Sequence, residues 1–357
     1  MNYNPTMVVK YWGVRGSIPA PLTTEQIQTK EIALILKIYE DGGMENLFGK
    51  EPSPKKIKEY LSELPISLSG TYGGDTTSIE VQTKDSPLIV FDAGSGARAL
   101  GNALLGRIFS GKGLNPLYSD GEPNREIHLF LSHYHWDHIQ GFPFFAPGFM
   151  ANGNRVDIHF YGKRNATTRL SNVLQFQQQY PHFPVEWQAM PCKKSYTELG
   201  RKEPVPISIG KAVVTFGELD HPDRVFGYRV EIDGKVFVCG TDTEHRDIVD
   251  PTIVQLAKNA DILYYDAQYL PEEYSGEKGM SRVRWGHSTY EWAVATALAA
   301  NTKTVVLGHH DPPRDDFELE NMLKRAFEYR DKELSFPKNS GKTLNIVIAR
   351  QGLEQIL

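Results

Sequence analysis

Short apolar runs, separated by glycine, proline or charged positions, recur along the 357-residue chain. Runs of about four to eight residues bounded by turn residues are typical of buried β-strands. Two alternating runs, at residues 225–232 and 235–239, flank Asp233-Gly234, a dipeptide that favours a tight hairpin turn. With these two runs included, strands are expected at residues 8–12, 78–82, 88–91, 127–131, 156–161, 213–216, 225–232, 235–239, 262–265, 304–307 and 344–349.

Between the strands, apolar residues three or four positions apart indicate amphipathic helices. Two segments, residues 20–69 and 163–206, interrupt the strand pattern and are interpreted as insertions. The first insertion is equally compatible with a lid or dimer contact beside a functional site and with a surface decoration. Helices are expected at residues 25–39, 54–64, 170–179, 253–259, 292–300 and 317–329.

The order of the elements suggests two similar halves, because groups of strands are followed twice by histidine-rich loops. This arrangement predicts a mixed α/β fold in which two β-sheets pack together and helices cover their outer faces. Residues 1–357 are expected to form a single domain that carries the two insertions.

The composition narrows the class of protein. Hydrophobic residues make up 40% of the chain, enough for a sizeable core, and no apolar run approaches the ~18 residues of a membrane span. No signal peptide is evident at the N-terminus, and two cysteines, Cys192 and Cys239, cannot form a disulfide framework. We therefore expect a cytoplasmic protein. A net charge of −5 disfavours general nucleic-acid binding but leaves small phosphate esters open.

The most distinctive stretch is residues 132–138, Ser-His-Tyr-His-Trp-Asp-His, which directly follows an expected strand. Three imidazoles and one carboxylate lie close together here, although the whole chain has only 11 histidines. His133 and His135 point the same way if the backbone stays extended, whereas Asp137 and His138 turn toward a second position. This split suggests two adjacent metal ions. Imidazole with carboxylate suits zinc, iron or manganese better than calcium or magnesium.

This stretch resembles the signature of the metallo-β-lactamase superfamily. In addition, residues 11–21, with the sequence YWGVRGSIPAP, resemble the opening of its phosphodiesterase-like, ribonuclease Z-like branch. The resemblance implies a four-layer αββα sandwich with a dinuclear metal site at the sheet edges. Two divalent ions are thus the expected cofactors, with zinc favoured over manganese or iron.

Three further positions match the family's metal ligands. His221 follows one strand, Asp242 lies in VFVCGTDTE, which resembles the family's Gly-Asp-Thr motif, and His309 follows a late strand. His310 is one residue off and points to the opposite face of an extended chain. The resemblance implies two ligand sets bridged by Asp242, namely His133, His135 and His221 for one metal and Asp137, His138 and His309 for the other.

Other residues are expected to support the metals. Asp92 resembles the family's structural aspartate, and a carboxylate behind a ligand histidine is what fixes the orientation of the ring. Asp266 is a second candidate for such a supporting acid. Asp75 stands where the family usually has asparagine, which leaves its role open. Arg15 is interpreted either as a site residue or as part of a surface ion pair.

The stretch Gly-His-Ser-Thr-Tyr-Glu at residues 286–291 precedes an expected helix. Ser288 and Glu291 have the spacing of a capping box, which places His287 just outside a helix N-terminus. Free N–H groups there favour an anion, and an imidazole beside it can protonate a leaving oxygen or hold a phosphoryl oxygen. The sequence therefore predicts an anion-binding position at His287.

The expected reaction is hydrolysis by a hydroxide bridging the two cations, which needs no serine or cysteine nucleophile. His287, Asp137 and Asp242 are expected to be catalytic. His182, in the aromatic and proline-rich stretch 180–185, and Ser288 are candidate substrate contacts.

The leading hypothesis is a phosphodiesterase for a small cyclic phosphodiester, either a 3′,5′-cyclic nucleotide or a ribose cyclic phosphate. The first alternative is a ribonuclease Z-like RNA 3′-processing endonuclease. That family usually carries a long tRNA-binding arm between the positions of His221 and Asp242, where this chain has a single hairpin. Phosphate binding along a long RNA also calls for a basic surface, which an acidic chain disfavours.

Two other classes of protein are weighed against the phosphodiesterase. A lactone or carboxylester hydrolase is one, and a non-catalytic binding module with a structural metal is the other. A closed structural site leaves no open position for water, whereas seven ligands shared by two ions do leave such positions. We expect a small phosphodiester as partner and neither long nucleic acid nor a membrane, while a homodimer is compatible with the first insertion.

Overall fold

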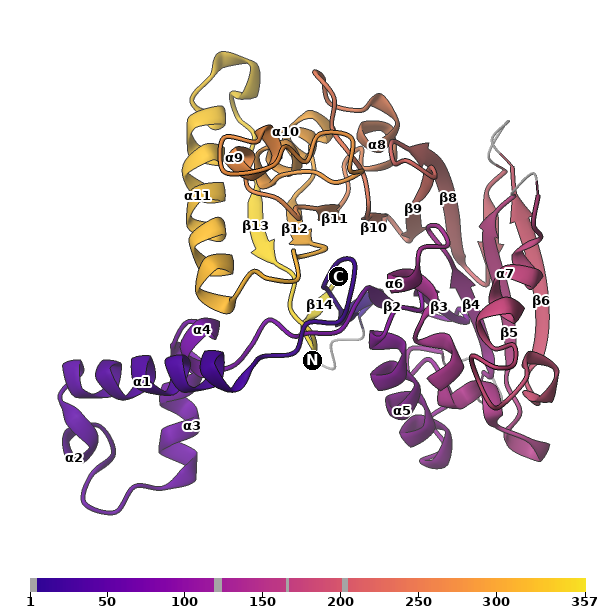
Figure 1. The fold of residues 1–357 in the computed structure, drawn as a ribbon, viewed down its shortest axis with the longest axis horizontal. Coiled ribbons are helices and arrows are strands. Elements are labelled where there is room, and N and C mark those ends of the chain that lie inside the picture. Colours follow the sequence, from indigo (N-terminus) through magenta and orange to yellow (C-terminus); the bar gives the residue numbers. More distant parts are fainter. Residues whose placement is uncertain (1–4, 119–123, 165–166, 201–204) are drawn as a thin grey trace.

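The computed structural model describes residues 5–118, 124–164, 167–200 and 205–357. Within these residues the chain forms two seven-stranded β-sheets packed against each other, with helices on their outer faces (Figure 1). The predicted α/β sandwich with outer helices is confirmed. Residues 1–4, in the N-terminal segment, and residues 165–166 and 201–204, in the expected second insertion, lie outside the described residues.

The first sheet is antiparallel at one side and parallel at the other. The strands from β14 through β1 and β2 to β3 are antiparallel neighbours, and those from β3 to β6 are parallel. Its order is β14 (Glu354–Ile356), β1 (Met7–Gly13), β2 (Ser78–Thr83), β3 (Leu88–Phe91), β4 (Glu126–Phe130), β5 (Asp157–Lys163) and β6 (Lys193–Leu199).

The second sheet has the same mixed character. Its parallel part runs from β10 to β13, and β7 to β10 are antiparallel neighbours. The hairpin expected at Asp233-Gly234 is confirmed, since both residues have positive φ angles of 47° and 75°. The order is β13 (Asn345–Ile348), β12 (Thr304–Gly308), β11 (Ile262–Asp266), β10 (Lys235–Gly240), β9 (Val225–Ile232), β8 (Ala212–Leu219) and β7 (Ile207–Ile209).

Alternation of side chains along each strand builds the layers. Phe91 and Phe130 of the first sheet are buried in one cluster with Tyr228 and Phe237 of the second. Leu129, next to Phe130, instead belongs to a cluster beneath the outer helix of the first sheet. Apolar side chains on both faces of a sheet require a cover on each, which explains the four-layer architecture.

Helices provide those covers. α5 (Gly96–Phe109) lies on the first sheet, and α8 (Pro251–Leu256), α10 (Tyr290–Ala300) and α11 (Asp316–Leu334) lie on the second (Figure 1). Among the described residues, no helix combines the length and apolarity needed to cross a lipid bilayer. Shorter elements are α6 (Trp136–Ile139), α9 (Pro271–Ser275), and the 3₁₀ turns η1 (Phe142–Phe144), η2 (Ala146–Phe149), η3 (Asn152–Asn154), η4 (Trp187–Ala189) and η5 (Pro337–Asn339).

The first insertion forms a helical arm that projects from the sandwich near α11 (Figure 1). An ion pair between Lys30 and Asp316, and hydrogen bonds from Ser67 to Glu320, join the arm to α11. Ile35, on the first helix, is 65% exposed. The two helices expected here are confirmed, and the arm consists of α1 (Thr24–Glu40), α2 (Gly43–Phe48), α3 (Pro54–Glu63) and α4 (Ile66–Ser69).

The second insertion contains the expected helix as α7 (Leu170–Gln177). The sequence pattern did not predict β6, because its polar residues, starting with Lys193 and Lys194, resemble a solvated face. The segment nevertheless pairs in parallel with β5 and forms the edge of the first sheet, with Lys193 exposed. An edge strand buries few side chains, so polar residues suffice there.

Candidate metal centre

The candidate metal centre lies at one edge of the two sheets. The first histidine-rich loop follows β4, His221 follows β8, Asp242 follows β10 and His309 follows β12. β8 is parallel to β10 because each is antiparallel to β9, so these segments leave the second sheet at the same edge. The topology therefore gathers groups from distant parts of the chain.

The first ligand group consists of His133, His135, His221 and Asp242, whose ligand atoms all lie within 4.8 Å of one another. Nδ1 of His135 is 3.3 Å from Nε2 of His221. Nε2 of His133 is 3.6 Å from Oδ2 of Asp242. These four are the three histidines that the family resemblance assigns to one metal and the expected bridging carboxylate, Asp242.

The second group consists of Asp137, His138, Asp242 and His309. Nε2 of His138 lies 3.2 Å from Oδ2 of Asp137 and 3.2 Å from Oδ1 of Asp242. Nε2 of His309 lies 3.1 Å from the same Asp242 oxygen. Since Asp242 belongs to both groups, the structure brings together all seven predicted ligands around one carboxylate.

Unpartnered atoms test whether this cluster fits cations. Among the described residues, Nε2 of His133, Nε2 of His138 and Oδ2 of Asp242 are buried, and none of them makes a hydrogen bond of acceptable geometry despite the contacts given above. Leaving such groups unpaired costs free energy, and native structures rarely tolerate it without a compensating partner. Several unpaired ligand atoms that lie close together could coordinate divalent metal ions. Imidazole with carboxylate is a set of ligands that zinc, iron or manganese prefers.

Supporting residues hold the rings so that they present Nε2 to the centre. Asp92 accepts a hydrogen bond from the Ser132 amide at 2.7 Å and contacts Nδ1 of His138 at 2.8 Å. Nδ1 of His221 lies 2.9 Å from the carbonyl oxygen of Gly286. A partner on the far nitrogen fixes the ring's tautomer and orientation. The position of Asp92 thus agrees with its expected supporting role.

The backbone is unusual where the ligand loops begin. Asp92, Asp242 and His309 all have positive φ angles, of 59°, 50° and 56°. Non-glycine residues seldom adopt this conformation, and they persist only where the surroundings impose it. The strain accompanies the sharp turns that direct these side chains back toward the centre.

Two glycines allow close approach to the ligand rings. A Cβ added at Gly16 meets the His309 ring at 2.6 Å, and one added at Gly286 meets Nδ1 of His221 at 2.3 Å. Gly286 also has a φ of 90°, which L-residues rarely adopt. Both glycines come from stretches that the sequence analysis singled out, and any side chain at either position would displace a ligand ring.

The histidines and carboxylates of the cluster shift one another's pKa values. Burial disfavours the charged form of His138, but Asp242 and Asp137 outweigh it and raise its pKa well above the usual value. Against burial, the same carboxylates raise the pKa of His309 to about 9. Burial and the charge of His138 lower the pKa of His133. Burial also opposes ionisation of Asp242, yet His138 and His309 keep its pKa well below the usual range. Cations can replace these protons.

His287 lies beside the cluster. Its Nδ1 contacts Oδ2 of Asp266 at 2.8 Å, and its ring stacks on His309 with centroids 4.9 Å apart. Asp266 therefore occupies the supporting position considered for it. His287 also lines a surface cavity of about 480 Å³ together with Asp137 and Asp242. The three expected catalytic residues thus face one opening.

The expected capping box is wrong. α10 begins at Tyr290 with Thr289 as N-cap, and no side chain caps it. The amide of Ser288 instead donates to Asp266, and its hydroxyl lies 2.9 Å from Nδ1 of His245. Both polar groups of Ser288 are thus engaged by protein partners, and the residue is fully buried from solvent. Its position does not favour the substrate contact expected for it.

Three other residues considered from the sequence make their contacts outside the two ligand groups. Arg15 is buried and donates to the carbonyl oxygens of Gly73 and Arg314, so of its two interpretations the surface ion pair is wrong. His310 contacts the carbonyl oxygen of Ala349, and burial lowers its pKa to about 3. Asp75 accepts hydrogen bonds from two side chains, Ser95 and Gln351, outside the two ligand groups.

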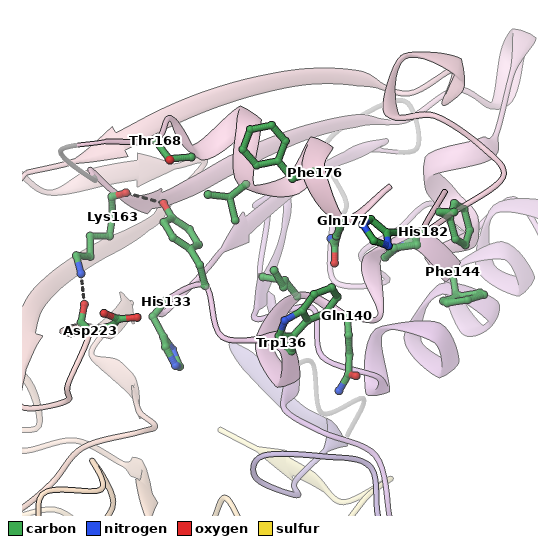
Figure 2. A pocket seen from close by; sticks show the side chains of 15 residues that line it. His133, Trp136, Gln140, Phe144, Lys163, Thr168, Phe176, Gln177, His182 and Asp223 are labelled. Atoms are coloured by element: carbon green, nitrogen blue, oxygen red, sulfur yellow. Dashed lines mark hydrogen bonds between the residues drawn. The ribbon is translucent and has the colours of Figure 1, made fainter. Parts of the chain in front are cut away.

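A larger cavity of about 740 Å³ adjoins the metal centre. Figure 2 shows its lining, in which His133 lies at one side and His182 at another. Phe144 lines it, whereas the neighbouring Phe142 and Phe145 are buried in the core. The structure thus places His182 in a cavity that also contains a candidate metal ligand.

Two residues near the centre were missed. Asp223 lies 3.3 Å from Nε2 of His135, and Gln268 lies 3.0 Å from Nδ1 of His309. Each is two positions beyond a residue that the sequence analysis did identify. Closeness in sequence to these residues was the available signal. It is not specific, because many other polar residues lie equally close to a predicted site residue.

The comparisons with known proteins agree with this geometry. Residues 88–310 match the family described as "Beta-lactamase superfamily domain". Because the match spans more than half of the chain, the chain belongs to this family, and the resemblance noted from its histidine-rich stretch is confirmed. The chain is therefore a hydrolase of the metallo-β-lactamase superfamily.

Individual relatives are more distant. The ribonuclease Z of Methanococcus aeolicus is 24% identical over 287 residues, which cover 69% of this chain and 84% of the relative. The ribonuclease Z of Nostoc sp. is 27% identical over 265 residues, or 59% of this chain and 76% of the relative. The metallo-β-lactamase fold protein YhfI from Bacillus subtilis superposes with a TM-score of 0.57 at 17% identity, over 99% of this chain and 100% of that one.

Proposed function

We propose that the protein is a dinuclear-metal phosphodiesterase that cleaves a small cyclic phosphodiester. His133, His135 and His221 would hold one ion, Asp137, His138 and His309 the other, and Asp242 both. Two bound cations would lower the pKa of a shared water and stabilise the attacking and leaving oxygens. The observation that carries the proposal is that buried imidazole and carboxylate atoms, three of them without a hydrogen-bond partner, gather in two adjoining groups that share Asp242.

In this proposal His287 acts on the leaving oxygen. Its Nδ1 is engaged by Asp266, which leaves Nε2 for the opening that it shares with Asp137 and Asp242. An imidazole held in one orientation can donate a proton or a hydrogen bond to the oxygen that departs. Zinc is the proposed metal, with manganese and iron as alternatives.

A second candidate function is RNA 3′-processing, because the M. aeolicus relative is a ribonuclease Z. Two features favour a small substrate instead. The chain connects His221 and Asp242 through the short β9–β10 hairpin, and its net charge is −5. Long RNA is usually held by a basic surface that contacts many phosphates.

The test is hydrolysis of bis(p-nitrophenyl) phosphate by the metal-loaded protein, followed by a panel of cyclic nucleotides and a precursor tRNA. We expect metal-dependent release of p-nitrophenol that His287→Ala lowers strongly. Full activity of that variant would overturn the role of His287. Cleavage of the tRNA precursor without turnover of any cyclic diester would favour the second candidate.

A further inference from the structure

The cavity of about 740 Å³ beside the metal centre has an aromatic lining. Trp136, Phe144 and Phe176 are 65%, 57% and 55% exposed, which is unusual for such large apolar side chains. Phe183 packs edge-on against Phe144 with ring centroids 5.4 Å apart. All four residues line the cavity, and Figure 2 labels Trp136, Phe144 and Phe176 among its lining side chains. Its volume lies within the usual range of small-molecule sites, and exposed aromatic faces favour a flat apolar ligand.

This cavity adjoins the opening at the metals, because the two share part of their lining. Tyr134 and Trp136 line both cavities, and His133, a candidate metal ligand, lines the aromatic one. A phosphodiester at the metals would therefore extend one of its substituents into the aromatic cavity. The residues that line the cavity therefore indicate the chemistry of that substituent.

Gln177, at the end of α7, provides the polar element. It lines the cavity and is 8% exposed, and in the part of the chain that the structure describes neither its amide nitrogen nor its amide oxygen has a hydrogen-bond partner. Gln140, which also lines the cavity, instead donates to Thr76. A buried amide without partners destabilises the free protein, and leucine, of nearly the same shape, would avoid that cost.

We propose that the aromatic cavity binds the nucleobase of the substrate and that Gln177 recognises its edge. A glutamine amide pairs with adenine in two hydrogen bonds, donating to a ring nitrogen and accepting from the exocyclic amine. Exposed aromatic rings supply the stacking surface that bases require. The inference rests on the proposed phosphodiesterase activity and deepens it: the substrate is an adenine 3′,5′-cyclic nucleotide rather than a ribose cyclic phosphate without a base.

The first experiment compares kcat/KM for 3′,5′-cyclic AMP with kcat/KM for methyl p-nitrophenyl phosphate, a diester without a base. In Gln177→Leu we expect the ratio to fall roughly tenfold, the discrimination that a bidentate contact provides. Gln177→Glu should shift preference toward 3′,5′-cyclic GMP, because a carboxylate only accepts and guanine offers adjacent N–H donors. Gln179→Leu, an exposed glutamine two residues further on, is the matched control and should keep the wild-type ratio.

The second experiment measures adenosine and ribose binding to the metal-loaded protein by calorimetry. Adenosine should bind and ribose should not, and Gln177→Leu should weaken adenosine binding without lowering the melting temperature. An unchanged substrate ratio in Gln177→Leu, or equal binding of adenosine and ribose, overturns the nucleobase site. A protein that binds adenosine through Gln177 but hydrolyses no diester supports the site and overturns the phosphodiesterase.

Discussion

Within the described residues, histidines meet carboxylates at the candidate metal centre, which the group of Asp266, His287 and His309 adjoins, and in a second, separate cluster that lacks the properties of a metal centre. In the second cluster the ligand atoms of Glu126, His128 and His159 also lie within 4.8 Å of one another. There, Nδ1 of His128 contacts the Tyr161 hydroxyl at 3.0 Å, and Nδ1 of His159 contacts the Ser195 hydroxyl at 2.6 Å. The two rings stack with centroids 4.7 Å apart.

The difference lies in the carboxylates. In the metal centre Asp137 and Asp242 are buried, and their charges raise the pKa of neighbouring His138. In the second cluster Glu126 is exposed, and burial together with His159 lowers the pKa of His128 to about 3. A cation needs buried negative charge close by, because exposed charge is screened by water. Proximity of histidines and an acid therefore does not define a metal site, whereas buried and unpaired donor atoms do.

The largest expected effect follows from removing the shared carboxylate. Asp242→Asn should lower metal content below one ion per chain and reduce kcat on the order of a thousandfold, because both cations lose a charged ligand. Elemental analysis and diester hydrolysis measure the two quantities. Glu126→Gln, the equivalent change in the second cluster, is the matched control and should leave both unchanged. Full metal content in Asp242→Asn would show that the shared carboxylate does not hold the metals, and the two clusters would then not differ as argued.

Chelation should have the next largest effect. Removing bound metal leaves the buried carboxylates and imidazoles of the centre without their partners, and metal that binds only the folded state stabilises it. We expect the melting temperature to fall by roughly 5 °C or more, a shift of the size that ligand linkage produces. Differential scanning calorimetry with and without chelator measures it. Asp242→Asn should show a much smaller shift, and equal shifts in both proteins would argue against the assigned ligands.

A smaller effect is expected from Asp92, the carboxylate that supports a ligand ring of the metal centre. Asp92→Asn keeps the shape of the side chain but removes the charge that contacts Nδ1 of His138. Loss of such a partner typically weakens metal binding by ~10- to ~100-fold. Competition with a chromophoric chelator measures the affinity. Ser195→Ala, which removes the hydroxyl partner of His159, serves as the control, and an effect of equal size there would contradict the distinction.

The same contrast explains what could be predicted from sequence. Residues 132–138 place four candidate ligands within six positions of the chain, so the sequence alone predicts the candidate metal centre. His128 and His159 are 31 positions apart and meet only because β4 and β5 pair in a register that sets them side by side. The sequence carries no signal for that register. The cluster was therefore missed, although both strands were predicted.

Other differences have the same origin. Ser288 and Glu291 had the right spacing for a capping box, but Asp266 and His245, from elsewhere in the fold, engage Ser288 instead. Gln177 belongs to a helix that was predicted, yet its unpaired amide depends on tertiary contacts that periodicity does not encode. Hydrophobic patterns predict strands, helices and layers, while the partners of individual polar groups follow only from the assembled structure.

The smallest expected effect is on the pH dependence of stability in the second cluster. The pKa of His128 is about 3 in the folded state and ~6.5 when unfolded, so the unfolded chain binds an extra proton between these values. Its contribution is thus complete above pH ~6.5 and is lost as the pH falls toward 3. His128→Phe should lose less stability than the wild type between pH 7 and 5, by up to ~2 kcal/mol in urea unfolding. Exposed His182→Gln is the control. A wild-type slope in His128→Phe would show that His128 takes up a proton in the folded state as readily as in the unfolded chain, which contradicts the lowered pKa.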